Sequence, residues 1–226
     1  PLIIPPLSWS WVLLAGALVF YTLADLFVVR ALATVESSTN ALIMRFITVW
    51  VTIGGITLYH EAATMPKLIG VVFIVAGSCV LITRGNIRKM PPGIIYSVLS
   101  TLFLATAFLM DKTLVTKFSI PLYTAITFIT PSLLLIPNLK HPIAELSKEL
   151  RSKGILLPVA GAIFGLYMLC QLFAYQIGEA SRVTPVIDSS ILLTVFLGIV
   201  FLKERSSIPQ KIMGAALILI GMNFIR

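Results

Sequence analysis

An internal repeat is the feature of this sequence that most restricts its fold. Eight residues between positions 26 and 66 reappear 143 positions later without a gap. They are Leu26, Ala31, Glu36, Ser38, Gly55, Ile56, Glu61 and Pro66, repeated as Leu169, Ala174, Glu179, Ser181, Gly198, Ile199, Glu204 and Pro209. After one inserted residue, Gly70 and Gly77 are repeated as Gly214 and Gly221. Eight identities in 41 positions are more than an apolar composition gives by chance, so the chain is internally duplicated.

The composition places this duplication in a membrane. Of the 226 residues, 58% are hydrophobic and 12% are charged, roughly half the charged share of a soluble domain. A soluble core of this size could not hide so much apolar surface, so lipid must cover the outside. The net charge of +8 then indicates lysines and arginines that flank the membrane. No basic run with interleaved aromatic residues is present, so we expect no nucleic-acid partner.

Charged and Pro- or Gly-rich breaks divide the chain into eight apolar segments of about 20 residues, the length that crosses a bilayer. The predicted membrane spans are 9–30, 38–59, 67–84, 92–110, 120–139, 155–177, 183–202 and 209–225. The polar stretch 140–154 predicts a short helix at the membrane interface. Spaced glycines predict close helix packing at two places, the repeated pair described above and the GxxxG pattern of Gly161 and Gly165.

The spacing of the repeat predicts how its two copies are oriented. A shift of 143 residues maps the first three spans onto the last three, a displacement of five spans. Because five is odd, matching helices cross the membrane in opposite directions, which is an inverted repeat. The expected fold is therefore an all-α polytopic membrane bundle of inverted five-helix repeats, with residues 1–84 in the first half and 85–226 in the second. The first half has only three spans, so we expect two helices to precede Pro1 and the intact protein to have ten.

Two segments are similar to the closing signature of EamA-type permeases in the drug/metabolite transporter superfamily. In residues 201–225, an apolar helix ends in Glu204, and a short link leads to a helix with spaced glycines. Residues 58–82 repeat this pattern around Glu61. Residues 173–200 also resemble the family, including a small-residue hairpin and Pro185 in the first turn of the next helix. The resemblance covers nearly the whole chain.

This resemblance implies ten helices in two inverted halves, around a cavity lined by spans 9–30, 38–59, 155–177 and 183–202. It does not specify the substrate, because the superfamily moves amino acids, nucleotide sugars, sugar phosphates, drugs and other metabolites. It also implies that both termini are cytoplasmic. The basic residues that flank the spans, eleven on one side and five on the other, favour the opposite orientation. The orientation therefore stays open.

The most informative candidate site residues are Arg45 and Asp188, which lie 143 positions apart and therefore occupy equivalent places in the two halves. Each lies several residues inside a span, where a charge costs at least about 2.5 kcal/mol on insertion scales and requires a partner. One interpretation is a cavity in which Arg45 holds an anionic group and Asp188 holds an amine or a proton. The other is a salt bridge that keeps the two halves in register.

Three other polar residues are candidates for substrate binding. Asp25 lies near the end of the first span and could titrate in a coupling step, although a solvated or paired carboxylate near the headgroups is the simpler interpretation. Gln171, in the equivalent span of the second half, could hydrogen-bond a solute. Ser189 adjoins Asp188, and serine is also an ordinary helix-packing residue in membranes.

Three aromatic residues, Tyr21, Trp50 and Tyr167, lie in spans that the resemblance assigns to the cavity. They could stack on a substrate, although single aromatic residues in helices more often serve packing. The two signature acids, Glu61 and Glu204, lie at helix ends, and we interpret them as terminal anchors.

The sequence contains no catalytic constellation. His60 and His141 lack metal-ligand spacing, and no Walker A motif or nucleophile elbow is present, so we expect neither an enzyme nor a cofactor. The predicted function is secondary, non-ATP-driven transport of a small metabolite or drug-like solute by alternating access in a cell or inner membrane. The alternative is a membrane scaffold or accessory subunit that moves no solute. The sequence leaves the oligomeric state open.

Overall fold

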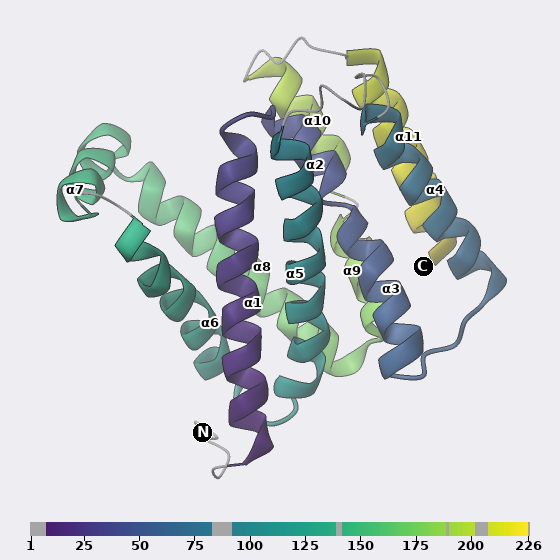
Figure 1. Cartoon of the computed structure of the whole chain (residues 1–226), viewed down its shortest axis with the longest axis horizontal. Coiled ribbons are helices and arrows are strands. Elements are labelled where there is room, and N and C mark those ends of the chain that lie inside the picture. The colour runs from purple at the N-terminus through teal and green to yellow at the C-terminus, as the bar shows by residue number, and fades with distance from the viewer. Residues whose placement is uncertain (1–7, 83–91, 139–141, 189, 202–207, 226) are drawn as a thin grey trace.

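The computed structural model describes residues 8–82, 92–138, 142–188, 190–201 and 208–225, which form a helical bundle (Figure 1). Its helices are α1 (Trp9–Leu32), α2 (Ser37–Ile43), α3 (Phe46–Leu58), α4 (Met65–Ile82), α5 (Pro92–Leu114), α6 (Ile120–Leu135), α7 (Pro142–Lys153), α8 (Leu156–Ile177), α9 (Ala180–Asp188), α10 (Ile191–Val200) and α11 (Ile208–Ile225), with a 3₁₀ turn η2 at Ile136–Asn138. The described residues contain no strand, which confirms the all-α prediction.

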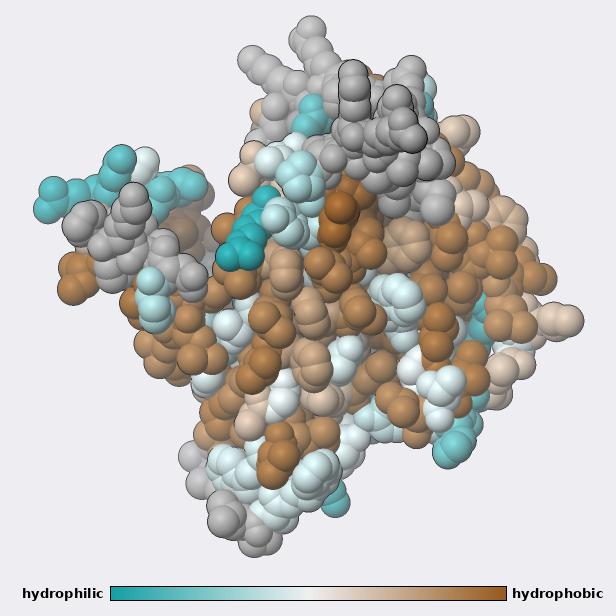
Figure 2. Space-filling model, in the orientation of Figure 1, coloured by the Kyte–Doolittle hydropathy of each residue, from teal (hydrophilic) through white to brown (hydrophobic). Residues whose placement is uncertain are grey.

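Within the described residues, five of the eight predicted spans correspond to helices that are long and apolar enough to cross a membrane. Within the described residues, five segments meet the length and hydropathy expected of a membrane helix: Trp9–Leu32, Ser37–Leu58, Pro92–Leu114, Leu156–Ile177 and Ile208–Ile225. The predicted spans 67–84 and 120–139 correspond to shorter apolar helices, Met65–Gly77 and Ile120–Leu135. Apolar side chains cover most of the visible surface of the bundle, and polar side chains gather on α7 at its edge (Figure 2).

Two predicted spans are interrupted, and the interruptions fall at equivalent places in the repeat. The sequence predicted continuous helices over 38–59 and 183–202, but the structure divides the first into α2 and α3 and the second into α9 and α10. At the first break the hydrogen bonding tightens, because the Arg45 amide donates to Leu42 O at 3.2 Å, three residues back. This leaves the carbonyl of Ala41, the usual helical partner, to accept from the Arg45 side chain, whose Nε lies 3.2 Å away.

The two interrupted spans run in opposite directions. The N-terminal piece of one packs on the C-terminal piece of the other: α2 contacts α10, and α3 contacts α9. Matching helices therefore cross the bundle antiparallel, as the displacement of five spans predicted.

The helices that close each half, α4 and α11, pack closely against each other. A Cβ atom built on Gly70 would lie 2.4 Å from Gly221 O, and one on Gly77 would lie 2.7 Å from Gly214 O. The order of contacts reverses along the chain, so α4 and α11 are antiparallel. The repeated glycines thus allow two backbones to touch, which confirms close helix packing for this set.

The same prediction is wrong for the GxxxG pattern on α8. A Cβ atom built on Gly161 or Gly165 would meet nothing within 4 Å; Gly161 is exposed and Gly165 is half-buried. The physical reason is the position of α8, which lies along one side of the bundle with most of its first half uncovered (Figure 1). Small residues permit close helix packing, but they do not by themselves ensure that another helix packs there.

Candidate functional site

A cavity of about 310 Å³ is lined by residues of four helices, α1, α5, α6 and α8. Ten described residues line it: Tyr21, Asp25, Leu104, Thr127, Phe128, Pro131, Ser132, Phe164, Met168 and Leu172. Two of the predicted site residues, Tyr21 and Asp25, are among them. The resemblance implied walls from the spans that contain α1 and α8, and both contribute, but the remaining walls come from α5 and α6.

Asp25 brings a negative charge to this cavity. Its side chain is exposed, and among the described residues it has no hydrogen bond or ion pair. It lies one helical turn after Tyr21 on α1, and this spacing places both side chains on the same face. The other described lining residues include no charged group. The cavity is therefore apolar and aromatic, with a single carboxylate.

Behind the cavity wall lies a buried polar cluster that the sequence did not reveal. The hydroxyl groups of Tyr21 on α1 and Tyr123 on α6 both donate short hydrogen bonds to the carboxyl of Asp111 on α5. Asp111 is 1% exposed and joins three helices. We predicted a span that ended at residue 110, which left Asp111 outside it. The helix continues to Leu114, which places this acid inside the bundle.

The equivalent residues Arg45 and Asp188 occupy the helix breaks. Arg45 lies between α2 and α3, and Asp188 is the last residue of α9. The Asp188 side chain and Ser189 lie outside the described part of the structure, so an ion pair between Arg45 and Asp188 stays a prediction.

Gln171 is buried at the junction of α8 and α9. Its amide nitrogen donates to the Tyr175 hydroxyl at 3.2 Å, and that hydroxyl lies 3.1 Å from the hydroxyl of Thr184. The amide oxygen of Gln171 has no hydrogen-bond partner within the described residues. Tyr175 therefore links α8 to α9, and Gln171 supports it from the same helix without lining the cavity.

The two remaining aromatic candidates make packing contacts. The indole nitrogen of Trp50 on α3 donates to the Thr101 hydroxyl on α5 at 3.2 Å. Tyr167 stacks on Phe164 of the same helix, with ring centroids 5.7 Å apart. Neither residue lines the cavity, although Phe164 does. The packing interpretation therefore fits both contacts.

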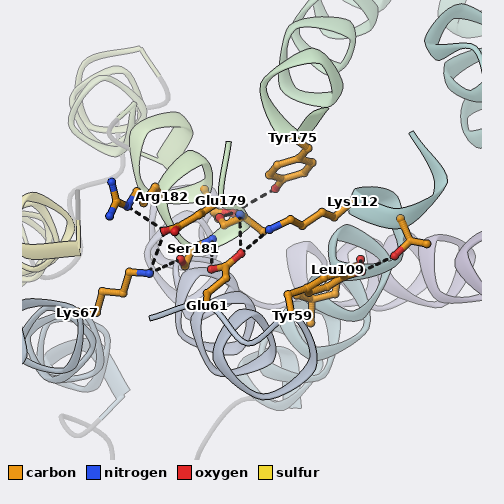
Figure 3. Close-up of polar contacts among 12 residues, drawn as sticks. Tyr59, Glu61, Lys67, Leu109, Lys112, Tyr175, Glu179, Ser181 and Arg182 are labelled. Carbon is orange, nitrogen blue, oxygen red and sulfur yellow. Dashed lines mark hydrogen bonds and ion pairs between the residues drawn. The ribbon is translucent and has the colours of Figure 1, made fainter. Parts of the chain in front are cut away.

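Ion pairs join the two halves (Figure 3). Glu61, which follows α3, accepts hydrogen bonds from the backbone amides of Ala180 and Ser181 at 3.1 and 3.3 Å and from Lys112 Nζ at 2.6 Å. The carboxylate therefore caps the N-terminus of α9, where the helix dipole favours a negative charge. Burial alone would raise the pKa of Glu61, but the hydrogen bonds from Lys112 and Ser181 outweigh it and hold the pKa below its usual value. The anchor predicted for Glu61 thus reaches across the two halves.

Two lysines make a reciprocal pair of contacts between the halves. Lys67 at the start of α4 binds Glu179 at 3.1 Å, and Lys211 at the start of α11 binds Glu36 at 2.6 Å. The two glutamates are equivalent in the repeat, and so are the two lysines once the inserted residue is counted. Lys67 also donates to the Ser181 hydroxyl at 2.9 Å. Both lysines are buried, at 2% and 0% exposure, so each half supplies a desolvated cation to an acid of the other half.

An all-helical bundle of apolar helices with inverted, interleaved halves is the architecture of a polytopic membrane protein. The model of the EamA-like transporter family matches residues 91–226. The chain therefore belongs to the EamA-like transporter family, within the drug/metabolite transporter superfamily, and is an integral membrane protein. This match confirms the resemblance and covers most of the predicted second repeat. No curated protein matches the chain.

Proposed function

We propose that this protein is a secondary transporter that moves a small metabolite or drug-like solute by alternating access, without ATP. The observation that carries the proposal is the antiparallel packing of two interrupted spans, α2–α3 and α9–α10, one from each half. Paired, interrupted helices in inverted halves are typical of secondary transporters, in which one arm rocks against the other around a central site.

The positions of the tight and loose contacts support this mechanism. The glycine contact between α4 and α11 and the buried lysine pairs hold the two halves together along one side of the bundle. On the other side, the cavity lies among α1, α5, α6 and α8, where α6 contacts α1 and is joined to α5 through Asp111. Rocking about the tight side would open the cavity to one face of the membrane and then to the other.

Alternating access can be tested with a single cysteine in the cavity. Ser132 lines the cavity on α6, so Ser132→Cys is introduced after both native cysteines, Cys79 and Cys170, are replaced by alanine. We expect a membrane-impermeant maleimide to label this cysteine in oriented vesicles from either side, because each side has access in one conformation. The matched control is Ser147→Cys on the polar helix α7, which should be labelled from one side only.

Solute flux separates the transporter from the scaffold alternative. Proteoliposomes are loaded with a pool of amino acids, nucleotides and cationic drugs, and the solutes that leave are identified by mass spectrometry. A transporter releases at least one solute faster than protein-free liposomes do. Labelling of Ser132→Cys from a single side, together with no flux of any pooled solute, would contradict the proposal and favour a scaffold.

A further inference from the structure

We propose that the cavity between α1, α5, α6 and α8 binds a small organic cation with an aromatic or apolar body, and that Asp25 is its counter-ion. This inference rests on the proposed function, because it names the class of solute for the same cavity. It follows from three observations: the charge of the cavity, the nature of its walls and its volume.

The charge of the cavity excludes the other ligand classes. Asp25 is the only charged residue among the described lining residues, and it has no ion pair or hydrogen bond within the described structure. Water solvates its carboxylate while the cavity is open. A ligand that fills the cavity displaces this water, and the carboxylate then requires a cation, since a buried carboxylate without a partner is unfavourable. A neutral ligand would leave the charge unpaired, and an anion would be repelled by it.

The walls of the cavity suit an organic cation, whose charged nitrogen carries carbon substituents. Phe128 and Phe164 meet edge to face, with ring centroids 5.5 Å apart, and Tyr21 supplies a third ring. Aromatic faces attract Lys-, Arg- or quaternary-ammonium-type charges, most strongly where water is excluded. Leu104, Met168 and Leu172 supply the apolar surface. A strongly hydrated metal ion would find few oxygen ligands here, because the cavity offers one carboxylate and two hydroxyl groups besides Tyr21.

The volume limits the size of the ligand. A cavity of about 310 Å³ is at the small end of the range for small-molecule sites. It accommodates a single aromatic ring with a substituted ammonium group and excludes a nucleotide sugar. The expected ligand is therefore a monovalent amine or quaternary ammonium compound with one ring or a short apolar chain.

The test compares three soluble ligands of one shape with different charges. Phenyltrimethylammonium is the cation, N,N-dimethylaniline N-oxide is its neutral analogue, and benzenesulfonate is the anion. Binding to the full chain in lipid nanodiscs is measured by calorimetry at neutral pH. We expect the cation to bind at least about tenfold more tightly than the N-oxide, and benzenesulfonate not to bind measurably. Absence of cation binding, or equal affinity for the cation and the N-oxide, would overturn the assignment.

Substitutions then test whether Asp25 causes the preference for a cation. Asp25→Asn should remove the difference between the cation and the N-oxide, whereas Asp25→Glu should keep it. Glu149→Gln, which removes an exposed acid from α7, is the matched control and should bind the cation as the unmodified protein does. If Asp25→Asn does not fold, Asp25→Glu and the ligand series still decide the question. Cation preference that survives Asp25→Asn in folded protein would place the counter-ion elsewhere and overturn the proposal.

Failure of this inference is distinguishable from failure of the proposed function. Flux of other pooled solutes without any cation preference would overturn the cation site and leave the transporter standing. Cation binding that depends on Asp25, without flux of any solute, would support the site and overturn transport.

Discussion

The two sides of this bundle use the same small residue in opposite ways. On one side, α4 and α11 meet through glycines that leave no room for a Cβ atom, and buried lysines bind acids of the other half. On the other side, Gly161 and Gly165 of α8 face open space, and a cavity lies among α1, α5, α6 and α8. The comparison teaches that the bundle is rigid along the line where the halves cross and open where the proposed solute binds. A protein that rocks requires both properties.

The largest expected effect comes from filling the glycine contact. Gly70→Leu would place side-chain atoms where Gly221 O and the Ile225 side chain already lie, so we expect it to destabilise the protein by about 3 kcal/mol or more. Gly165→Leu on α8 is the matched control, and it should be neutral or slightly stabilising because leucine favours helix more than glycine does. Thermal unfolding in detergent measures both. Equal losses in the two variants would remove the distinction between the two sides.

The next effect tests the polar cluster beside the cavity. Asp111→Ala leaves the buried hydroxyl groups of Tyr21 and Tyr123 without their acceptor, and we expect a loss of about 3 kcal/mol in the free energy of unfolding. The triple variant Asp111→Ala, Tyr21→Phe and Tyr123→Phe should recover part of this loss, because no unpaired hydroxyl remains. A triple variant less stable than Asp111→Ala alone would contradict this, because it would show that the two hydroxyl groups stabilise the protein without Asp111.

A smaller effect is expected from the reciprocal lysines. Lys211→Met removes a buried cation from Glu36, and because Glu36 is 37% exposed and can be solvated, we expect a cost of about 2 kcal/mol. The double variant Lys211→Met and Glu36→Gln should recover much of it in a double-mutant cycle. Lys153→Met on α7, where the lysine is 60% exposed, is the control and should change stability little. If the double variant lost as much stability as the two single variants together, the two side chains would not stabilise the protein through their ion pair.

The smallest effect is a pH dependence at Glu61. The pKa of this carboxyl is lower in the folded protein than its usual value of 4.5, so its ionised form contributes stability above pH 4.5, and this contribution is lost as the pH falls through the folded pKa. The stability advantage over Glu61→Gln should therefore be constant near neutral pH and shrink below pH 4.5. The unfolding temperature of both proteins across pH 3–7 measures it. A stability advantage over Glu61→Gln that grew as the pH fell would contradict a lowered pKa for Glu61.

Much of the fold could be predicted because the repeat constrains geometry directly. The parity of the displacement predicted the antiparallel halves, and the repeated glycines predicted close helix packing, which the structure shows between α4 and α11. The helix breaks could not be predicted, because the residues around Arg45 include no glycine or proline, and the break appears only as a change in backbone hydrogen bonding. The failed prediction for Gly161 and Gly165 has a similar cause, since a small residue permits close packing but does not determine whether another helix packs against it.

Of the candidate site residues, only two that lie on the same helix come together at the cavity. Tyr21 and Asp25 lie one turn apart, so the sequence could place them on one face of α1, and both line the cavity. Asp111 was missed because its partners come from two other helices. The binding roles of Arg45, Asp188 and Ser189 stay predictions, and the pairing of each lysine with an acid of the opposite half requires the tertiary arrangement.

The reciprocal lysine contacts have a consequence for biogenesis. Lys67 emerges from the ribosome more than a hundred residues before Glu179, its partner. Until the later helices insert, this ammonium group has no acid from the other half to neutralise it, so the early segment cannot complete its assembly in lipid. Its maturation therefore waits for the end of translation, and a nascent chain truncated before α9 should be a substrate for membrane quality-control proteases.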